Sequence, residues 1–159
     1  MQNPLNGKQY NDFFKIIEPY LNQVDGITFS GGEPLYQAME LLELLDKIPH
    51  TDKMLFTGYY KNELNDIQLK CFDKFDLVVE GRFEEDKMGD FLWRGSSNQI
   101  ISSPSNKYLN KLDLFTNAKS AGLEIKMIDE EIIYYGIPTK NNEIKKIEYM
   151  LKYMGNHLN

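Results

Sequence analysis

The segment Thr28–Leu35 (TFSGGEPL) holds the residues best suited to chemistry in this chain of 159 residues. It overlaps an apolar, β-branched run, Val24–Phe29, that predicts a strand, and it leads into a run with helical periodicity. At the carboxyl end of a parallel strand, Gly31 and Gly32 let the backbone adopt positive φ and approach a small molecule closely. Glu33 adds a carboxylate there, so the segment predicts a site for a ligand whose docking end is cationic.

A second interpretation of the same residues needs no ligand. Gly31 and Gly32 then only turn the chain, and Glu33 only complements the positive end of the next helix. Pro34 fixes the start of that helix in either interpretation. The residues alone favour neither interpretation.

Other familiar sites are poorly supported. The chain has no GxxxxGK[ST], no GxGxxG after the first strand, no HExxH and no GxSxG. A Ser-His-Asp site or a histidine metal site would depend on His50 and His157 alone. The single cysteine, Cys71, cannot form an intrachain disulfide or hold a zinc ion or an iron–sulfur cluster by itself. We expect Cys71 to be a small core residue on the apolar side of a helix.

The elements that would position Glu33 alternate between strands and helices. The predicted strands are Val24–Phe29, Lys53–Thr57, Asp76–Val79 and Asn98–Ser102. The predicted helices are Asp12–Leu21, with a last turn distorted by Pro19, Leu35–Ile48, Asn62–Phe72 and Tyr108–Ser120. Short apolar strands alternating with helices are typical of βαβ units, so the predicted fold class is α/β.

The rest of the chain predicts one long loop and a C-terminal extension of the same domain. Glu80–Arg94 shows no sustained period, and loops of this length tend to be functional. Leu123–Ile128 and Glu131–Tyr135 predict a hairpin through Asp129-Glu130, and Glu143–Met154 predicts an amphipathic packing helix. Because no linker or repeat divides the sequence, we expect residues 1–159 to form one domain.

Charge and hydropathy exclude two classes of partner. The chain has 18 Lys and Arg against 24 Asp and Glu, a formal net charge of −6, so it offers no general positive field for nucleic acid. No apolar run approaches the roughly 18 residues of a membrane span, and the N-terminus lacks the pattern of a secretion signal. Together with the lone cysteine, these features predict a cytoplasmic protein without a membrane or nucleic-acid partner.

The TFSGGEPL segment resembles the S-adenosylmethionine (SAM) binding segment of radical SAM enzymes, whose GGE motif meets the amino group of the methionyl moiety. In register with it, Leu55–Tyr59 (LFTGY), Asp76–Gly81 (DLVVEG) and Trp93–Ile101 (WRGSSNQII) look like successive segments of the anaerobic ribonucleotide reductase activating proteins and related glycyl-radical activases. The resemblance runs from about Asn3 to Pro138. It implies a partial (β/α) barrel-like parallel sheet of the radical SAM type that lacks the first strand and the cluster loop.

The resemblance also implies a set of site residues. The implied cofactor-binding residues are Ser30, Gly31, Gly32, Glu33, Thr57, Gly58 and Glu80, with Gly81 beside them. Family members often carry Asp at the position of Glu80. The implied substrate or partner contacts are Arg94, Ser96, Ser97, Asn98 and Gln99. For Arg94 two alternatives stay open, since it could instead order its loop or pair with the loop's own acids. No catalytic residue follows from the spacing.

The activity implied by the resemblance is reductive cleavage of SAM at a 4Fe-4S cluster, with the resulting 5′-deoxyadenosyl radical removing hydrogen from a glycine of a partner enzyme. The implied partners are a glycyl-radical enzyme, such as an anaerobic ribonucleoside-triphosphate reductase, and an electron donor such as flavodoxin. The alternative function is a cluster-less, non-catalytic module that binds SAM or another protein.

The cysteines of such a cluster are missing from this sequence. Three thiolates, usually CxxxCxxC, hold the cluster, and here Met1-Gln2-Asn3-Pro4 begins where a CxNP-like stretch would follow the last cysteine. Either the protein extends upstream, or it lost its cluster naturally. We expect an upstream extension, because a fold without its first strand exposes a sheet edge that proteins usually cover.

Overall fold

The structure is a computed structural model that describes residues 13–48, 51–119, 124–128 and 131–135. Its main sheet has four strands in the order β1 (Gly26–Phe29), β2 (Asp52–Thr57), β3 (Leu77–Glu80) and β4 (Ile100–Ser102). The first three strands are parallel, and β4 runs antiparallel to β3. The predicted α/β class is confirmed as a mixed fold with a mostly parallel, open sheet, whereas the barrel-like character stays a prediction.

The helices are shorter than predicted, because 3-10 turns precede or follow them. The α-helices are α2 (Ala38–Lys47), α3 (Asp66–Phe72) and α4 (Leu112–Asn117), and residues 13–17 are also helical. The 3-10 turns are η1 (Glu18–Tyr20), η2 (Pro34–Gln37), η3 (Lys61–Glu63), η4 (Glu85–Lys87) and η5 (Leu109–Lys111). Pro19 lies in η1, which confirms the distorted last turn. The start of α3 was predicted too early, because the Asn65 side chain caps the amides of Ile67 and Gln68.

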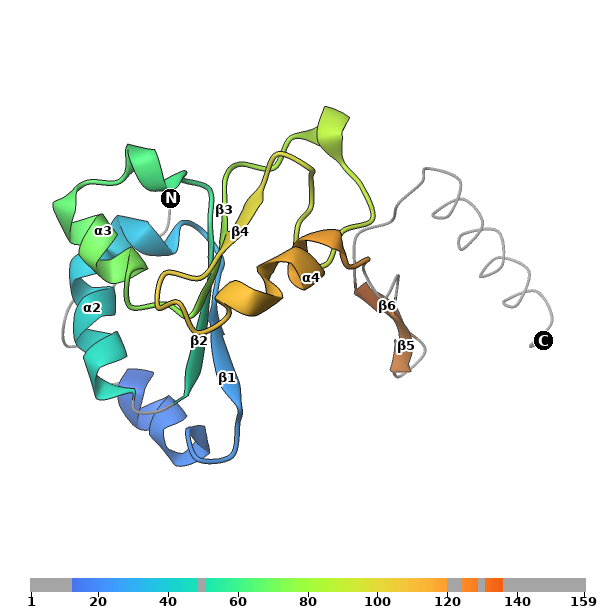
Figure 1. The fold of residues 1–159 in the computed structure, drawn as a ribbon. Coiled ribbons are helices and arrows are strands. Elements are labelled where there is room, and N and C mark those ends of the chain that lie inside the picture. The colour runs from blue at the N-terminus through green and yellow to red at the C-terminus, as the bar shows by residue number, and fades with distance from the viewer. Residues whose placement is uncertain (1–12, 49–50, 120–123, 129–130, 136–159) are drawn as a thin grey trace.

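Helices cover both faces of the sheet (Figure 1). On one face α2 and α3 bury Leu41, Leu44 and Phe72 against Leu55 and Val78. On the other face η5 and α4 cover a second apolar cluster, which consists of Leu77, Val79 and Ile101 with the partly buried Met54, Phe56, Tyr108, Leu112 and Phe115. Cys71 is fully buried in the first cluster, as predicted. The two apolar clusters hold the strands of the sheet between the helices.

Strand β1 forms one edge of this sheet, and its outer side pairs with no other strand among the described residues. A hollow of about 520 Å³ lies beside it. The hollow is lined mainly by apolar side chains, among them Phe13, Tyr20 and Val24, and it reaches Ser30 and Gly31.

The predicted C-terminal hairpin is present. Strands β5 (Glu124–Ile128) and β6 (Glu131–Tyr135) form a separate two-stranded antiparallel sheet in which Ile128 lies opposite Glu131. The predicted turn at 129–130 and the predicted helix Glu143–Met154 lie outside the described residues. Among the described helices none is long and apolar enough to cross a membrane.

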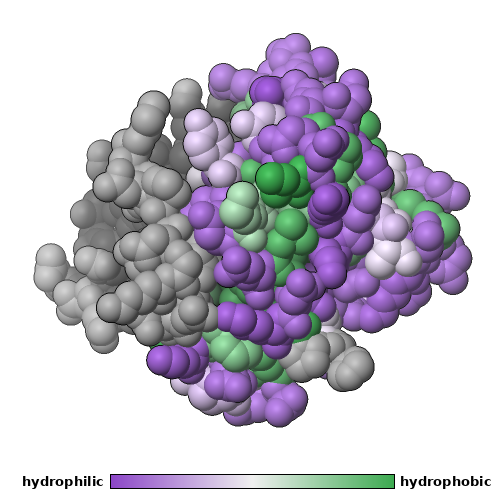
Figure 2. Space-filling model, turned by 90° about the vertical axis from the view of Figure 1, so that its left-hand side faces the viewer, coloured by the Kyte–Doolittle hydropathy of each residue, from purple (hydrophilic) through white to green (hydrophobic). Residues whose placement is uncertain are grey.

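The outer face of α2 and α3 is largely hydrophilic, with a small apolar patch (Figure 2). Met39 on α2 and Ile67 on α3 are 60% and 41% exposed. Scattered exposed apolar side chains of this kind are normal on protein surfaces, so we assign no function to the patch.

Candidate functional site

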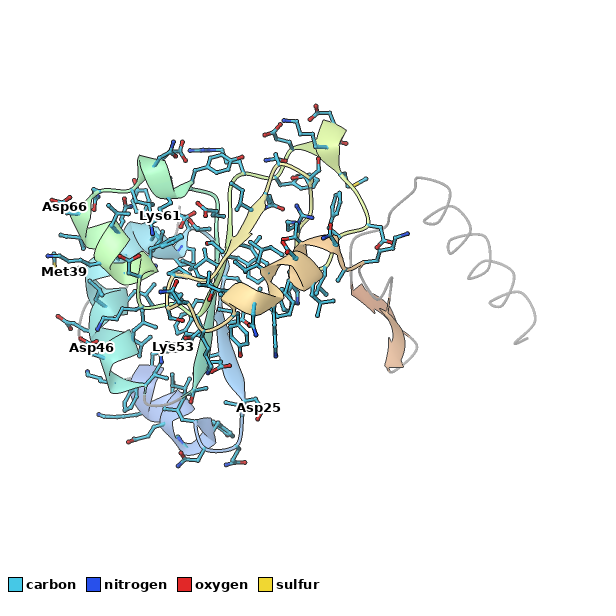
Figure 3. All side chains as sticks on the ribbon, in the orientation of Figure 1. Asp25, Met39, Asp46, Lys53, Lys61 and Asp66 are labelled. Atoms are coloured by element: carbon cyan, nitrogen blue, oxygen red, sulfur yellow. The ribbon has the colours of Figure 1, made fainter. Side chains whose placement is uncertain are left out.

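The predicted cofactor residues lie where the parallel strands end. Figure 3 shows Lys61, which follows β2, at this end of the sheet, and Asp25 and Lys53 at the end where β1 and β2 begin. The segment Ser30–Glu33 leaves β1 here, and Gly58 leaves β2. Open α/β sheets bind ligands at the carboxyl ends of their strands, so the topology brings these residues to a suitable place.

The turn after β1 needs its two glycines. Gly31 has φ +83° and Gly32 has φ +51°, backbone conformations that L-residues rarely adopt. A Cβ atom added at either position would have no heavy atom of the described residues within 4 Å. These residues therefore leave the turn open, and a ligand could approach its main-chain groups.

The Glu33 carboxylate joins the turn after β1 to the end of β2. Oε1 accepts hydrogen bonds from the Leu35 amide at 3.0 Å and from Thr57 Oγ1 at 2.8 Å. Oε2 accepts from the Gly58 amide at 2.8 Å. A carboxylate offers about four acceptor positions, so three are used and about one remains. The bond to Leu35 caps the helical turn that follows, as expected if Glu33 binds no ligand. The bonds to Thr57 and Gly58 go beyond such a cap, because they join Glu33 to the end of β2.

Thr57 links the ends of all three parallel strands. Its hydroxyl donates to Glu33 and accepts from the Tyr59 amide at 3.2 Å. Its carbonyl accepts from the Gly81 amide at 3.1 Å, just beyond β3. Thr57 is 5% exposed, so it stabilises the residues of the site and offers a ligand little surface.

Glu80 does not share a cluster with Glu33. Its side chain is 5% exposed, and its carboxylate accepts from the Lys61 amide at 2.6 Å and from Ser102 Oγ at 3.3 Å. These bonds join β3 to the segment after β2 and to β4. The geometry gives Glu80 a supporting position, with its charge directed at the protein itself.

Arg82 lies next to the candidate site and is not among the residues predicted from the sequence. A Cβ atom placed on Gly58 would lie 3.5 Å from Glu33 Oε2 and 3.9 Å from Arg82 Cγ, so the Glu33 carboxylate and the Arg82 stem both lie next to Gly58. The exposed guanidinium pairs with Glu63 at 2.9 Å. An exposed ion pair is weak, so this cation is able to change partner. Its position directly after Gly81, the glycine that follows a parallel strand, was the available signal.

Arg94 is committed to the main chain. Its guanidinium donates to the carbonyls of Thr116 at 2.7 Å, Gln99 at 3.1 Å and Ser97 at 3.4 Å. It also lies 4.6 Å from the centre of the Phe91 ring. The side chain is 8% exposed, and burial lowers the pKa of the guanidinium. Of the alternatives left open by the sequence, this geometry matches the ordering of the loop.

The side chains of Ser96, Asn98 and Gln99 also bond mainly to main-chain groups. Ser96 is fully buried, and its hydroxyl accepts from the Glu84 amide at 3.1 Å. Asn98 Nδ2 donates to the Arg82 carbonyl at 2.7 Å and to the Tyr60 hydroxyl at 3.1 Å. Gln99 Nε2 donates to the Gly81 carbonyl at 2.9 Å. Only Ser97 of the predicted contact residues has an exposed side chain.

The residues present do not fit an iron–sulfur cluster. The 159-residue sequence contains one cysteine, and no group of three metal-binding side chains lies close together in the described part of the chain. Cys71 is buried in the core, and burial raises the pKa of its thiol to about 12. A cluster is held by three thiolates, and a single cysteine buried in the core cannot supply them.

Comparisons with known proteins agree with the resemblance seen in the sequence. A family model described as a 4Fe-4S single cluster domain matches residues 3–102. The anaerobic ribonucleoside-triphosphate reductase-activating protein of Escherichia coli strain K12 is 39% identical over 83 residues, which cover 48% of this chain and 54% of that protein. The protein of the same name from Enterobacteria phage T4 is 33% identical over 86 residues, which cover 50% and 54%.

Two further facts limit what these similarities show. The chain spans about half the length of the curated relatives that it matches. No solved structure matches the chain. The resemblance to reductase-activating proteins predicted from the sequence is confirmed, while the roles of single residues remain predictions.

Proposed function

Because this chain belongs to the 4Fe-4S single cluster domain family, we propose that it forms the SAM-binding part of a protein that activates a glycyl-radical enzyme. The observation that carries the proposal is the open turn at Gly31 and Gly32, next to a carboxylate that is held in place by β2. The similarity to reductase-activating proteins supports the same class of function.

The site can hold both charged groups of an α-amino acid. The main-chain carbonyls of the Gly31–Gly32 turn and the remaining acceptor position of Glu33 would bind the ammonium group. Arg82 would leave Glu63 to bind the carboxylate, because a guanidinium matches the geometry of a carboxylate. Bound SAM would supply the 5′-deoxyadenosyl group, and the residues of this chain would bind and orient its methionyl end.

The partners belong to the same proposal. The matched relatives are named as activators of anaerobic ribonucleoside-triphosphate reductase, so we take a glycyl-radical enzyme of that type as the partner. A cytoplasmic electron donor such as flavodoxin would serve the complete activating protein. No step through a cluster is assigned to these 159 residues, since they lack its thiolates.

A second candidate function is a SAM-binding or protein-binding module without a cluster. The observation in its favour is that the single cysteine is buried in the core. Both candidate functions use the same SAM site. They differ in whether bound SAM is cleaved or only bound.

Calorimetric titration with SAM tests the shared site. We expect Glu33→Ala to weaken binding by about ten-fold or more, because it removes an acceptor for the ammonium and the anchor of the turn. Glu43→Ala, an exposed glutamate on α2, is the matched control and should bind as the wild type does. Equal affinity of wild type and Glu33→Ala would overturn the assignment of the Gly31–Glu33 segment, and absence of SAM binding to the wild type would overturn the proposed function itself.

A further inference from the structure

Two amides of the RGSSNQ segment hold the main chain that carries Arg82. Gln99 Nε2 donates to the carbonyl of Gly81, and Asn98 Nδ2 donates to the carbonyl of Arg82 itself. We infer that Asn98 and Gln99 are positioning residues for Arg82, and that they thereby set the affinity of the site for a ligand carboxylate. The inference rests on the proposed function and extends it to residues that touch no ligand.

The segment 94–99 is held firmly enough to act as a support. Gln99 Oε1 accepts from the amides of Gly95 at 2.7 Å and Ser96 at 3.2 Å, so the side-chain amide cannot rotate freely. The Gln99 carbonyl is held by Arg94, which also binds the Thr116 carbonyl of α4. The segment is therefore joined to α4 on one side and to the rim of the site on the other.

The hydrogen-bonded main chain of Gly81 and Arg82 fixes the position from which the Arg82 side chain extends. Gly81 has φ +103°, and its amide donates to the carbonyls of Thr57 and Tyr59. With both the amide and the carbonyl of Gly81 bonded, and with the Arg82 carbonyl bonded to Asn98, the main chain has little freedom at this point. The Arg82 stem is thus kept beside Gly58, whose amide binds the Glu33 carboxylate, although its guanidinium is exposed.

The bonds of these two amides explain why the residue types matter. A carbonyl needs a donor, and both Asn98 and Gln99 supply an N–H group, which an ionised Asp or Glu could not. Their amides are used inside the protein, which distinguishes positioning from direct recognition of a partner chain. The structure leaves Asn98 Oδ1 without a partner among the described residues, so Asn98 retains one acceptor.

The test compares two ligands, SAM and its decarboxylated form, S-adenosylmethioninamine, by calorimetry. We expect the wild type to prefer SAM by about five- to ten-fold, the effect of one charge-assisted pair at a partly exposed site. Asn98→Ala should reduce that preference to about two-fold or less, while affinity for the decarboxylated ligand changes little. Gln99→Glu keeps the shape and the acceptor of Gln99 but removes the donor to Gly81, and it should act in the same direction.

Asn117→Ala is the matched control, because the Asn117 side chain is exposed and its amide donates to the carbonyl of Asp113 within α4. The melting temperature of each variant is measured as well, to show whether the variant is folded. A purely structural role of Asn98 and Gln99 would lower the affinity for both ligands alike. Unchanged preference in Asn98→Ala and Gln99→Glu would overturn the inference while leaving the SAM site intact. If the wild type binds SAM and its decarboxylated form equally well, the inference fails but the proposed function stands. If the wild type does not bind SAM, both fail.

Discussion

The turns after β1 and β3 both contain a glycine with positive φ, but their surroundings differ. Gly31 and Gly81 both adopt positive φ at the carboxyl end of a parallel strand. In the described part of the chain, a Cβ atom on Gly31 would meet no heavy atom within 4 Å, whereas a Cβ atom on Gly81 would lie 2.6 Å from the Tyr60 ring. The open turn gives a ligand access to the main chain, and the closed turn fixes the residue that follows it.

The strands that carry these turns differ in the same way. Strand β3 lies between β2 and β4, and all four of its residues are buried. Strand β1 lies at the edge beside the apolar hollow, and its residues are exposed or half-buried. Local stability follows burial and hydrogen bonding, so the β1 side should open more readily than the β3 side.

The largest effect should come from adding a methyl group at the closed turn. We expect Gly81→Ala to lower the free energy of unfolding by about 3 kcal/mol, because it adds a clash with Tyr60 to the cost of positive φ. Gly31→Ala is the matched control and should cost only about 1–2 kcal/mol, the price of the backbone conformation alone. Urea unfolding of both variants measures the difference, and equal losses would show that the two turns are packed alike.

A smaller loss of stability is expected when a buried arginine is replaced by lysine, which has fewer hydrogen-bond donors. Arg94→Lys should lower the free energy of unfolding by about 1–2 kcal/mol, because one ammonium cannot reach three separate carbonyls. Arg82→Lys offers the same exchange at an exposed guanidinium with one carboxylate partner, and thermal unfolding should barely change. If both variants melt alike, Arg94 does not hold the closed region together.

The sequence predicted the order of the elements well, because apolar periodicity and glycine turns are local signals. Strand β3 and the Gly31–Glu33 turn are found where the patterns placed them. The direction of Arg94 could not be predicted, since its acceptors include the carbonyl of Thr116, 22 residues away in the chain. Arg82 was missed for a related reason: its place after a strand-end glycine is a weak signal in the sequence, and its proximity to Gly58 depends on the pairing of β2 with β3.

The smallest effect is expected at the opposite end of the sheet, where Asp52 begins β2. Its carboxylate contacts the Lys107 ammonium and the Tyr108 hydroxyl, and these hydrogen bonds, that of Lys107 first, hold the pKa of Asp52 below its ordinary value of 3.8. A carboxylate with a lowered pKa stabilises the fold above its unfolded pKa and loses this contribution as the pH falls through the folded pKa. Asp52→Asn should therefore lower the melting temperature by about 2–4 °C near neutral pH, and the gap to the wild type should shrink below about pH 4.

The same variant shows whether the two ends of the sheet act independently. Asp52 lies at the amino end of β2, whereas Thr57 and Gly58 lie at its carboxyl end, so SAM affinity should not change in Asp52→Asn. Calorimetry at neutral pH measures this, next to thermal unfolding across the acidic range. A melting-temperature gap that stays constant with pH would contradict the ion pair as its source. A loss of SAM affinity would mean that the strand ends are coupled through β2, and the contrast between the open and closed turns would then depend on the whole strand.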